Sequence, residues 1–223
     1  SKGLKLILTM PENMSLERRK ILKAYGAQVV LTPASQGMRG SIEKAVELVN
    51  TTPGSFMPSQ FDNPDNPKVH FETTGPEIFH DTDGQVDFVV IGVGTGGSIT
   101  GIGEYLKGKN PSVKVVAVQP EESPLLTGGT PHPHKLQGLM PNFIPSILNL
   151  KVIDEVISVS DQDAYKASRT LATSEGLLCG ISGGAALHAS MILSQRSENQ
   201  GKNIIVLLPD GGERYLSTLL YEE

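Results

Sequence analysis

Short apolar runs alternate with amphipathic segments along this chain of 223 residues. Runs of about four to eight apolar residues are typical of buried strands, whereas apolar residues spaced like Ile42, Ala45, Val46 and Val49 predict one face of a helix. We expect strands within residues 4–9, 27–33, 86–92, 113–120, 152–160 and 203–209. Helices are expected between them, and this alternation predicts an α/β fold with a mainly parallel sheet.

Capping residues mark the ends of several expected helices. Ser15 precedes a helix that ends at Gly26, and Ser160 with Asp163 forms a variant of the capping box for a later helix. In contrast, residues 119–150 are rich in proline and have no regular periodicity. We therefore expect that stretch to be irregular.

Residues 55–67, SFMPSQFDNPDNP, interrupt the alternation with proline, asparagine and aspartate. This composition makes the stretch the best candidate for a crossover between two lobes. The opening segment SKGLKLILTMP enters a strand-like run almost at once. From this we expect the polypeptide to be a fragment of a longer one.

Composition excludes several classes of function. The net charge is -5 and there is no basic run, which argues against a nucleic-acid partner. No apolar run approaches the roughly 20 residues of a membrane span, and the start has no signal-peptide pattern. The single cysteine cannot form an internal disulfide, which fits a reducing cytoplasm.

The glycine-rich stretch at residues 92–97, GVGTGG, follows an expected strand and matches the dinucleotide fingerprint G-x-G-x-x-G. Backbone N–H groups at such a helix start bind anions, and Thr95 and Ser98 add hydroxyl donors. A dinucleotide site also needs an acid after the next strand, where Glu121 lies behind Pro120, a poor platform for a ribose. We therefore favour a phosphate on a different ligand over a dinucleotide or a merely tight turn.

Two further glycine-rich turns, at residues 180–184 and 210–212, also follow apolar runs. Ligands of α/β sheets bind beyond the carboxyl ends of the strands, so we expect these turns to converge with the loop at 92–98. This convergence is the strongest purely physical indication of where the site lies.

The sequence GISGG around Ser182 matches the nucleophile elbow of hydrolases. That fold needs an acid and then a histidine after the serine. Asp210 would serve as the acid, but the last histidine is His188, so the hydrolase interpretation fails. Ser182 as a helix N-cap remains an alternative, and Asp210 either orients a ligand or caps its turn.

His132 and His134 are spaced closely enough to bind a metal, but no third ligand is evident. We therefore expect a solvated loop and no metal site. Cys179 lies in an apolar run and is expected to be a small core residue.

With these turns identified, the sequence resembles the cysteine synthase (O-acetylserine sulfhydrylase) family of pyridoxal-phosphate enzymes. The resemblance lies in segments that occur in the family's order: MPENMSLERRKILKAYGAQVVLT, QFDNP, GVGTGGSITG, CGISGGAAL and LPDGGERYLS. It implies the tryptophan-synthase-β-like fold (fold type II), with two α/β lobes and mainly parallel sheets. Residues 1–62 would be the remainder of the smaller N-terminal lobe, which is incomplete, and residues 63–223 the larger lobe that binds the cofactor.

The resemblance also assigns site residues. The loop for the 5′-phosphate of pyridoxal 5′-phosphate would consist of Gly94, Thr95, Gly96, Gly97 and Ser98. Ser98 stands where the family usually has threonine and keeps the hydroxyl. Ser182 would bind the pyridine nitrogen, and Asp210 would lie close to the ring in a role that we leave open. Gln60 and Gly138 would bind the substrate.

The implied reaction is a β-replacement in which O-acetylserine loses acetate and sulfide adds to give L-cysteine. The family's Schiff-base lysine would precede Ser1, so we assign no catalytic lysine and expect this chain alone to be inactive. The resemblance further implies a cytoplasmic homodimer that binds small-molecule substrates and, as a possible partner, the C-terminal tail of serine acetyltransferase.

One loop departs from the family pattern. Leu139, Met140 and Pro141 replace small residues, and we expect them to line the mouth of the active site. This departure leaves two alternatives: a β-replacement with another thiol, as in cystathionine β-synthase, and a non-catalytic module that binds the acetyltransferase tail. Gly183, where a second serine is common, is a milder change.

Overall fold

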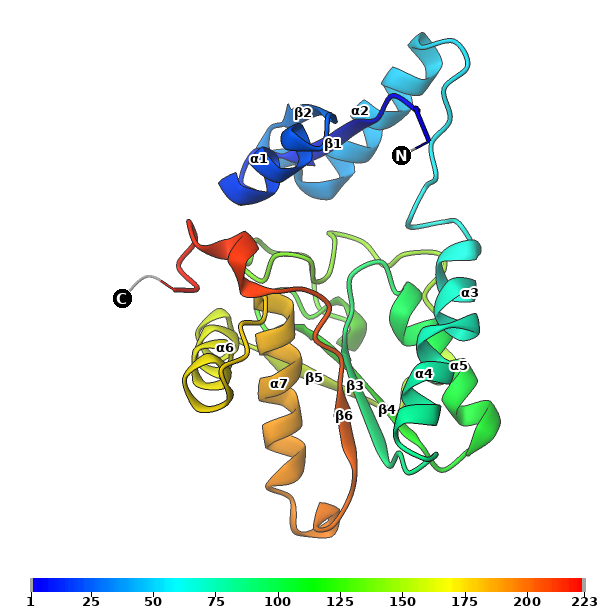
Figure 1. The fold of residues 1–223 in the computed structure, drawn as a ribbon, viewed down its shortest axis with the longest axis vertical. Helices are drawn as coiled ribbons and strands as arrows, with labels where there is room; N and C mark the ends of the chain where they lie inside the picture. Colours follow the sequence, from blue (N-terminus) through cyan, green and yellow to red (C-terminus); the bar gives the residue numbers. More distant parts are fainter. Residues whose placement is uncertain (1, 222–223) are drawn as a thin grey trace. The chain divides into compact units, whose positions relative to one another are not determined.

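The computed structural model describes residues 2–221. These residues form two compact units (Figure 1). The first consists of residues 2–58 together with residues 213–221, and the second of residues 59–212. The chain therefore passes from one unit to the other at two places, after Pro58 and after Gly212.

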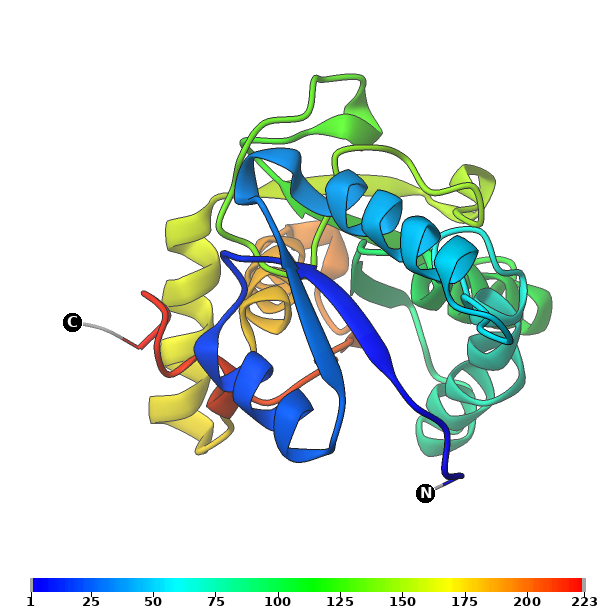
Figure 2. The ribbon, with the colours of Figure 1, turned by 90° about the horizontal axis from the view of Figure 1, so that it is seen from above.

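The first unit, seen from above in Figure 2, contains a two-stranded parallel sheet. Its elements are β1 (Ile7–Pro11), α1 (Leu16–Ala24), β2 (Gln28–Thr32) and α2 (Gly37–Thr51). The register pairs Ile7 with Gln28 and Pro11 with Thr32. The first strand begins three residues later than the apolar run, and Leu4 and Leu6, which precede it, are exposed.

The C-terminal segment is attached to α1 by side-chain contacts. Tyr215 is only 1% exposed, and Arg18 donates a hydrogen bond to its hydroxyl at 2.9 Å while its guanidinium lies 5.5 Å from the ring centroid. Ser217 donates to the carboxylate of Glu17 at 2.6 Å. The sequence pattern did not indicate that this segment belongs with the first unit.

The second unit is a four-stranded parallel sheet in the order β5-β4-β3-β6. The strands are β3 (Phe88–Gly92), β4 (Lys114–Pro120), β5 (Glu155–Val159) and β6 (Ile204–Val206). The helices are α3 (Asp65–Glu72), α4 (Thr74–Asp81), α5 (Gly97–Lys109), α6 (Asp161–Glu175) and α7 (Ile181–Ser194). Helices α6 and α7 cover one face of the sheet and α3 to α5 the other (Figure 1). The predicted α/β fold with a mainly parallel sheet is confirmed.

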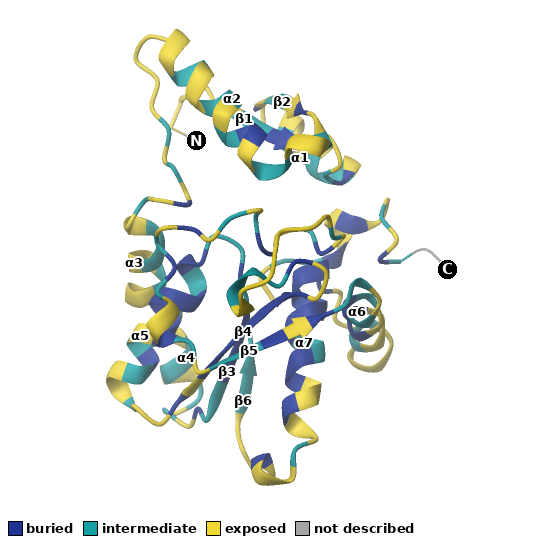
Figure 3. Cartoon of the chain, turned by 180° about the vertical axis from the view of Figure 1, so that it is seen from behind, coloured by how far each residue is buried: buried dark blue, intermediate teal, exposed yellow. Residues whose placement is uncertain are grey.

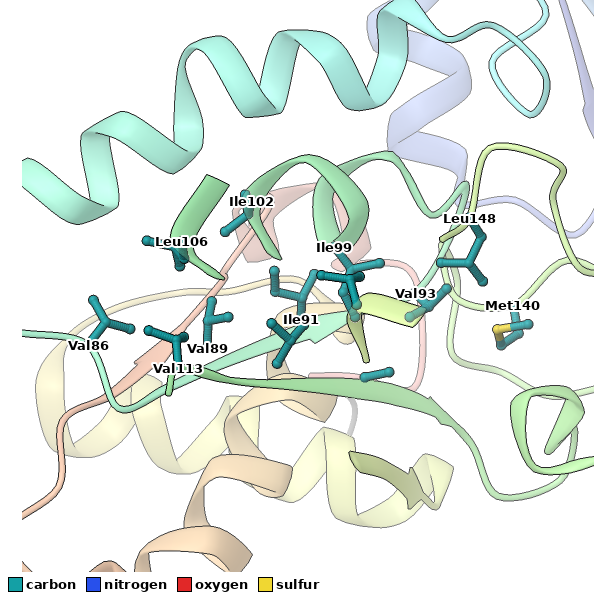
Figure 4. Packing of buried hydrophobic residues seen from close by; sticks show 13 residues of the cluster. Val86, Val89, Ile91, Val93, Ile99, Ile102, Leu106, Val113, Met140 and Leu148 are labelled. Atoms are coloured by element: carbon teal, nitrogen blue, oxygen red, sulfur yellow. The ribbon is translucent and has the colours of Figure 1, made fainter. Parts of the chain in front are cut away.

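The core of the second unit lies between the sheet and α5 (Figure 4). Val89 and Ile91 of β3 pack against Ile99, Ile102 and Leu106 of α5, and all five are buried. Figure 3 shows burial running along the central strands and along α7. A central parallel strand is covered on both faces, which explains its unbroken apolar sequence.

Helices α3 and α4 were not predicted: the expected crossover took in residues 55–67, and residues 68–81 were assigned no element. Helix α3 starts in the polar stretch itself, where the Asp65 N–H donates to Asn63 Oδ1 at 2.9 Å. Its apolar side chains Val69 and Phe71 are largely exposed, so the segment lacks the strong periodicity of a buried helix. The last residues of the expected crossover at 55–67 therefore belong to the first turn of α3.

The predicted cap at Ser160 is confirmed, since its hydroxyl accepts a hydrogen bond from the Asp163 N–H at 3.1 Å. The apolar run before α7 forms no strand within the described chain, and only an isolated bridge joins Cys179 to Gly211. Among residues 2–221, no helix combines the length and the apolar character needed to cross a bilayer.

Candidate functional site

A pocket of about 160 Å³ opens where β3 and β6 end. Its lining residues are Gly92, Gly94, Thr95, Gly96, Ser98, Ile99, Gly138, Leu139, Ser182, Leu207 and Pro209. The turns at 92–98 and 180–184 therefore meet as predicted. The turn at 210–212 lies next to the pocket through Pro209 without lining it.

The loop between β3 and α5 presents backbone N–H groups to this pocket. Gly96 is the N-cap of α5 and has φ +86°, a conformation that only glycine adopts without strain. The first helical bond runs from the Thr100 N–H to the Gly96 carbonyl at 3.1 Å. The N–H groups of Ser98 and Ile99 have no acceptor within the described chain, as expected for the first turn of a helix. The start of α5 is thus an anion-binding geometry.

Helix α3 contacts both hydroxyl groups of this loop. Asn66 Nδ2 lies 3.0 Å from Thr95 Oγ1, and His70 Nε2 lies 3.1 Å from Ser98 Oγ. The other ring nitrogen of His70 contacts Thr74 Oγ1 at 2.9 Å. Partial burial lowers the pKa of His70 below its ordinary value of 6.5, which favours the neutral imidazole.

The sequence analysis missed Asn66 and His70. Their spacing of four residues places them on one face of a helix, which was the available signal. That signal was usable only if residues 65–72 were recognised as helical.

Ser182 borders the pocket opposite the glycine loop. It is the second residue of α7, which starts at Ile181 with Gly180 as the N-cap. The alternative that Ser182 is itself the N-cap is therefore wrong. Its side chain is 7% exposed, and its hydroxyl has no hydrogen-bond partner among residues 2–221, so it is available to a ligand in the pocket.

The loop at residues 138–141 behaves differently from the expectation. Leu139 lines the pocket next to Gly92, but neither Met140 nor Pro141 is among the described lining residues. Met140 is 2% exposed and packs in the core beside Val93, as Figure 4 shows. The expectation that all three residues line the mouth is corrected, because burial of the apolar Met140 side chain draws it into the core.

Met140 also has an unusual backbone. Its φ is +28°, in the left-handed region that favours glycine. Its N–H donates to the Val93 carbonyl at 2.7 Å, and its carbonyl lies 3.2 Å from His134 Nε2. These contacts, with the burial of its side chain, hold the residue in a strained conformation.

Three predicted site residues, Gly97, Gln60 and Asp210, are not among the described residues that line the pocket. Gln60 is exposed, and its carbonyl accepts from Asn66 Nδ2 at 2.8 Å. Asp210 follows the lining residue Pro209, and its carbonyl accepts from the Gly180 N–H at 3.0 Å.

Burial, with a smaller contribution from the charge of Asp210, raises the pKa of the Cys179 thiol, consistent with a core cysteine.

The chemistry of the pocket is that of neutral donors. Among the described lining residues none is acidic or basic, and none is a lysine. Backbone N–H groups and the hydroxyls of Thr95, Ser98 and Ser182 provide hydrogen-bond donors without any carboxylate to repel an anion. The donor set therefore fits a phosphate ester, with Ser182 left for a second polar group of the same ligand.

The two histidines considered for a metal have other contacts. His132 Nε2 lies 2.9 Å from Thr130 Oγ1, and His134 Nε2 contacts the Met140 carbonyl. Within residues 2–221 no group of three or more histidine, cysteine, aspartate or glutamate side chains is arranged to hold a metal ion.

A larger hollow, of about 310 Å³, follows one face of α6, and we call it the α6 groove. It is lined by Gln162, Tyr165, Lys166, Arg169, Thr170 and Thr173. Burial, with a smaller contribution from Asp161, raises the pKa of Tyr165 to about 12. The groove lacks the convergence of strand ends and helix N-termini that marks the first pocket, the one lined by Gly92, Gly94 and Gly96, which we call the glycine pocket.

A family model and a curated protein that match this chain both point to pyridoxal-phosphate enzymes. A family model described as "Pyridoxal-phosphate dependent enzyme" matches residues 1–210. Cysteine synthase of Staphylococcus aureus (strain Mu50) is 50% identical over 222 residues, which cover 99% of this chain and 71% of that protein.

Solved structures agree with this relationship. Cysteine synthase (OASS) from Entamoeba histolytica superposes with a TM-score of 0.91 at 44% identity, over 98% of this chain and 65% of that one. The O-acetylserine dependent cystathionine beta-synthase from Helicobacter pylori gives a TM-score of 0.92 at 39% identity, over 98% and 71%. The chain thus spans about two thirds to seven tenths of the length of these relatives.

Proposed function

Since the chain belongs to the family of pyridoxal-phosphate dependent enzymes and has their tryptophan-synthase-β-like fold, we propose that its glycine pocket binds pyridoxal 5′-phosphate. We further propose that the whole protein makes L-cysteine from O-acetylserine and sulfide. The similarity to cysteine synthases of two organisms supports the reaction. The observation that carries the proposal is the neutral donor set at the start of α5.

In this proposal the phosphate lies at the N-terminus of α5. The N–H groups of Ser98 and Ile99 and the hydroxyls of Thr95 and Ser98 would hold it by donating to its oxygens. The positive end of the helix dipole stabilises the anion further. No charged side chain is needed, so the loop binds the phosphate by position and not by a salt bridge.

Ser182, which borders the same pocket, would donate its hydroxyl proton to the pyridine nitrogen. When bound, the cofactor supplies an electron sink for the breaking of a bond at the β-carbon of the amino acid. A neutral hydroxyl, unlike a carboxylate, does not stabilise a protonated ring nitrogen. Ser182 would therefore leave the cofactor a weaker electron sink than a carboxylate partner would. A weaker sink suits elimination of a good leaving group such as acetate.

Gln60 and Gly138 are proposed to contact the substrate. Gly138 borders the pocket, and Gln60 is joined to the phosphate loop through Asn66. The amide of Gln60 has the donors that a substrate carboxylate needs. Asp210 lies next to Pro209 at the edge of the pocket, and its role stays open.

We expect the 223-residue chain alone to bind the cofactor without catalysing turnover. The reaction needs an amine that forms a covalent bond to the cofactor, and no lysine is among the pocket residues that the structure describes. Titration of the chain with pyridoxal 5′-phosphate, followed by an assay for cysteine, tests this directly. Cysteine formation by the chain alone would contradict it.

A second candidate is β-replacement by another thiol, favoured by the similarity to the Helicobacter pylori enzyme and by Leu139 in the pocket wall. An assay of the whole protein with O-acetylserine or serine, against sulfide or homocysteine, separates the two. Cysteine from O-acetylserine and sulfide supports the first candidate, and cystathionine as the only product overturns it. Binding of an acetyltransferase tail peptide without any turnover would instead support a non-catalytic module.

The Ser182→Asp variant tests the assignment of the ring nitrogen. Aspartate at this position, in the first turn of α7, would be stabilised as the anion and would in turn favour a protonated ring nitrogen, whose N–H it would accept. In the whole protein we expect an altered absorption spectrum of the bound cofactor and a loss of β-replacement rate of about tenfold or more, the factor that 1.4 kcal/mol represents. Ser182→Ala, which adds no charge, is the control. An unchanged spectrum and rate in the aspartate variant would refute the assignment.

A further inference from the structure

The hydroxyl oxygen of Thr95 accepts two hydrogen bonds from other residues of the protein. Its oxygen lies 3.0 Å from Asn66 Nδ2 and 3.3 Å from the Gly97 N–H. The identity of the Asn66 atom follows from its second partner, the Gln60 carbonyl at 2.8 Å, because a carbonyl can only accept. Asn66 therefore donates one amide proton to Gln60 and the other to Thr95.

These two contacts determine what Thr95 can do in the pocket. A hydroxyl oxygen has two lone pairs and one proton. Both lone pairs of Thr95 are used by N–H donors, of which Gly97 can only donate. The one hydrogen-bonding capacity left is the Thr95 proton, and Thr95 borders the pocket.

We propose that Asn66 is a positioning residue that makes the Thr95 hydroxyl a donor to a bound phosphate ester. The inference rests on the proposed function of the pocket and identifies a residue outside the glycine loop. A hydroxyl that can only donate favours a phosphate oxygen that bears no proton.

The position of Asn66 depends on the packing of α3 against α5. A Cβ atom at Gly97 would collide with the side-chain amide of Asn66 and would lie 2.9 Å from its Nδ2. Glycine at position 97 therefore leaves the space that this amide occupies. His70 contacts Ser98 from the same helix. Because an imidazole nitrogen can donate or accept, the argument rests on Asn66, whose role is fixed by its partners.

The test compares the dissociation constants of pyridoxal 5′-phosphate and of pyridoxal, which lacks the phosphate, for the 223-residue chain. Asn66→Ala should weaken the phosphate ester about tenfold, as expected for a hydrogen bond to a charged group, and leave pyridoxal unchanged. Asn66→Asp, which can only accept from Thr95, should weaken it further. Asn63→Asp adds the same charge nearby, retains an acceptor for the Asp65 N–H, and serves as the control.

A double-mutant cycle with Thr95→Val distinguishes positioning from a general structural role. If Asn66 acts through the Thr95 hydroxyl, Asn66→Ala should have little further effect in the Thr95→Val background. Equal weakening of both ligands, additive effects, or no weakening would overturn the inference. Thermal unfolding verifies that each variant is folded, and Asn66→Ser replaces any variant that is not. A wild-type chain that binds the two ligands equally would overturn the proposed function as well.

Discussion

Three hydroxyl groups border the glycine pocket, those of Thr95, Ser98 and Ser182, and all are uncharged at ordinary pH. The hydroxyls of Thr95 and Ser98 are hydrogen-bonded to side chains of α3, whereas the hydroxyl of Ser182 has no partner among residues 2–221. This difference fits the two proposed roles, binding of a phosphate and binding of a ring nitrogen. Hydroxyls held in place suit a phosphate, and a hydroxyl without a protein partner can adjust to a ring nitrogen that accepts.

At the same scale, His70 should make the protein less stable in acid. Burial lowers the pKa of folded His70 below 6.5, so the unfolded chain binds the proton more readily. The free energy of unfolding contributed by this group is therefore intact above about pH 6.5 and falls as the pH drops toward the folded pKa. Urea unfolding between pH 7.5 and 5.5, compared with His70→Gln, measures the contribution. An NMR titration that gives His70 a pKa of 6.5 or above would contradict the prediction.

At Met140, the alanine variant should be less stable than the glycine variant, which is the reverse of the usual order. Met140→Ala loses buried contacts worth about 2–5 kcal/mol and keeps the strained backbone. Met140→Gly loses the same contacts but relieves strain of about 1–3 kcal/mol. We therefore expect both variants to be destabilised, with alanine worse than glycine by about 1 kcal/mol or more. Denaturant unfolding gives both values, with Met140→Leu as a volume-conserving control. Glycine less stable than alanine would show that the backbone at 140 is not strained.

At the scale of elements, the contact between α3 and α5 connects the fold to the site. Gly101 lies in the middle of α5, where a Cβ atom would meet the Pro67 carbonyl and approach the Phe71 nitrogen to 2.7 Å. A side chain there would push back the backbone of α3, which cannot move as a flexible side chain would. Asn66 and His70 would then withdraw from the phosphate loop.

We accordingly expect Gly101→Ala to lower the free energy of unfolding by about 1–3 kcal/mol and to weaken binding of pyridoxal 5′-phosphate. Gly108→Ala lies in the same helix with no atom within 4 Å of its Cβ position, and should raise stability by about 0.5–1 kcal/mol. Denaturant unfolding and equilibrium dialysis compare the two. If both alanines behave alike, close packing at Gly101 is not what places α3.

At the scale of the whole molecule, the sheet was predictable because its central strands are apolar on both faces. The glycine loop was also predictable as a turn at a helix start, since turn chemistry leaves a local sequence pattern, whereas the local patterns around Ser182 suggested a nucleophile elbow or an N-cap and gave neither correctly. Asn66 and His70 were not, because their contacts depend on a helix with exposed apolar residues such as Val69. Met140 was misplaced because sequence gives a residue's neighbours along the chain but not the side of the loop on which it is buried.

The C-terminal segment illustrates the same limit. Tyr215 lies far along the chain from Arg18, yet the two side chains are in contact in the first unit. A short run around Tyr215 has no periodicity that would assign it to either unit. Contacts of this kind depend on which surfaces the rest of the fold leaves available.

The central claim is that the start of α5 binds the phosphate of pyridoxal 5′-phosphate. Backbone amide NMR of the 223-residue chain, with the cofactor added in steps, tests it most directly. The account predicts that the largest shifts occur at the amides of Ser98 and Ile99, and that pyridoxal without phosphate does not reproduce them. Unmoved amides at residues 94–99, with shifts concentrated at another surface such as the α6 groove, would contradict it.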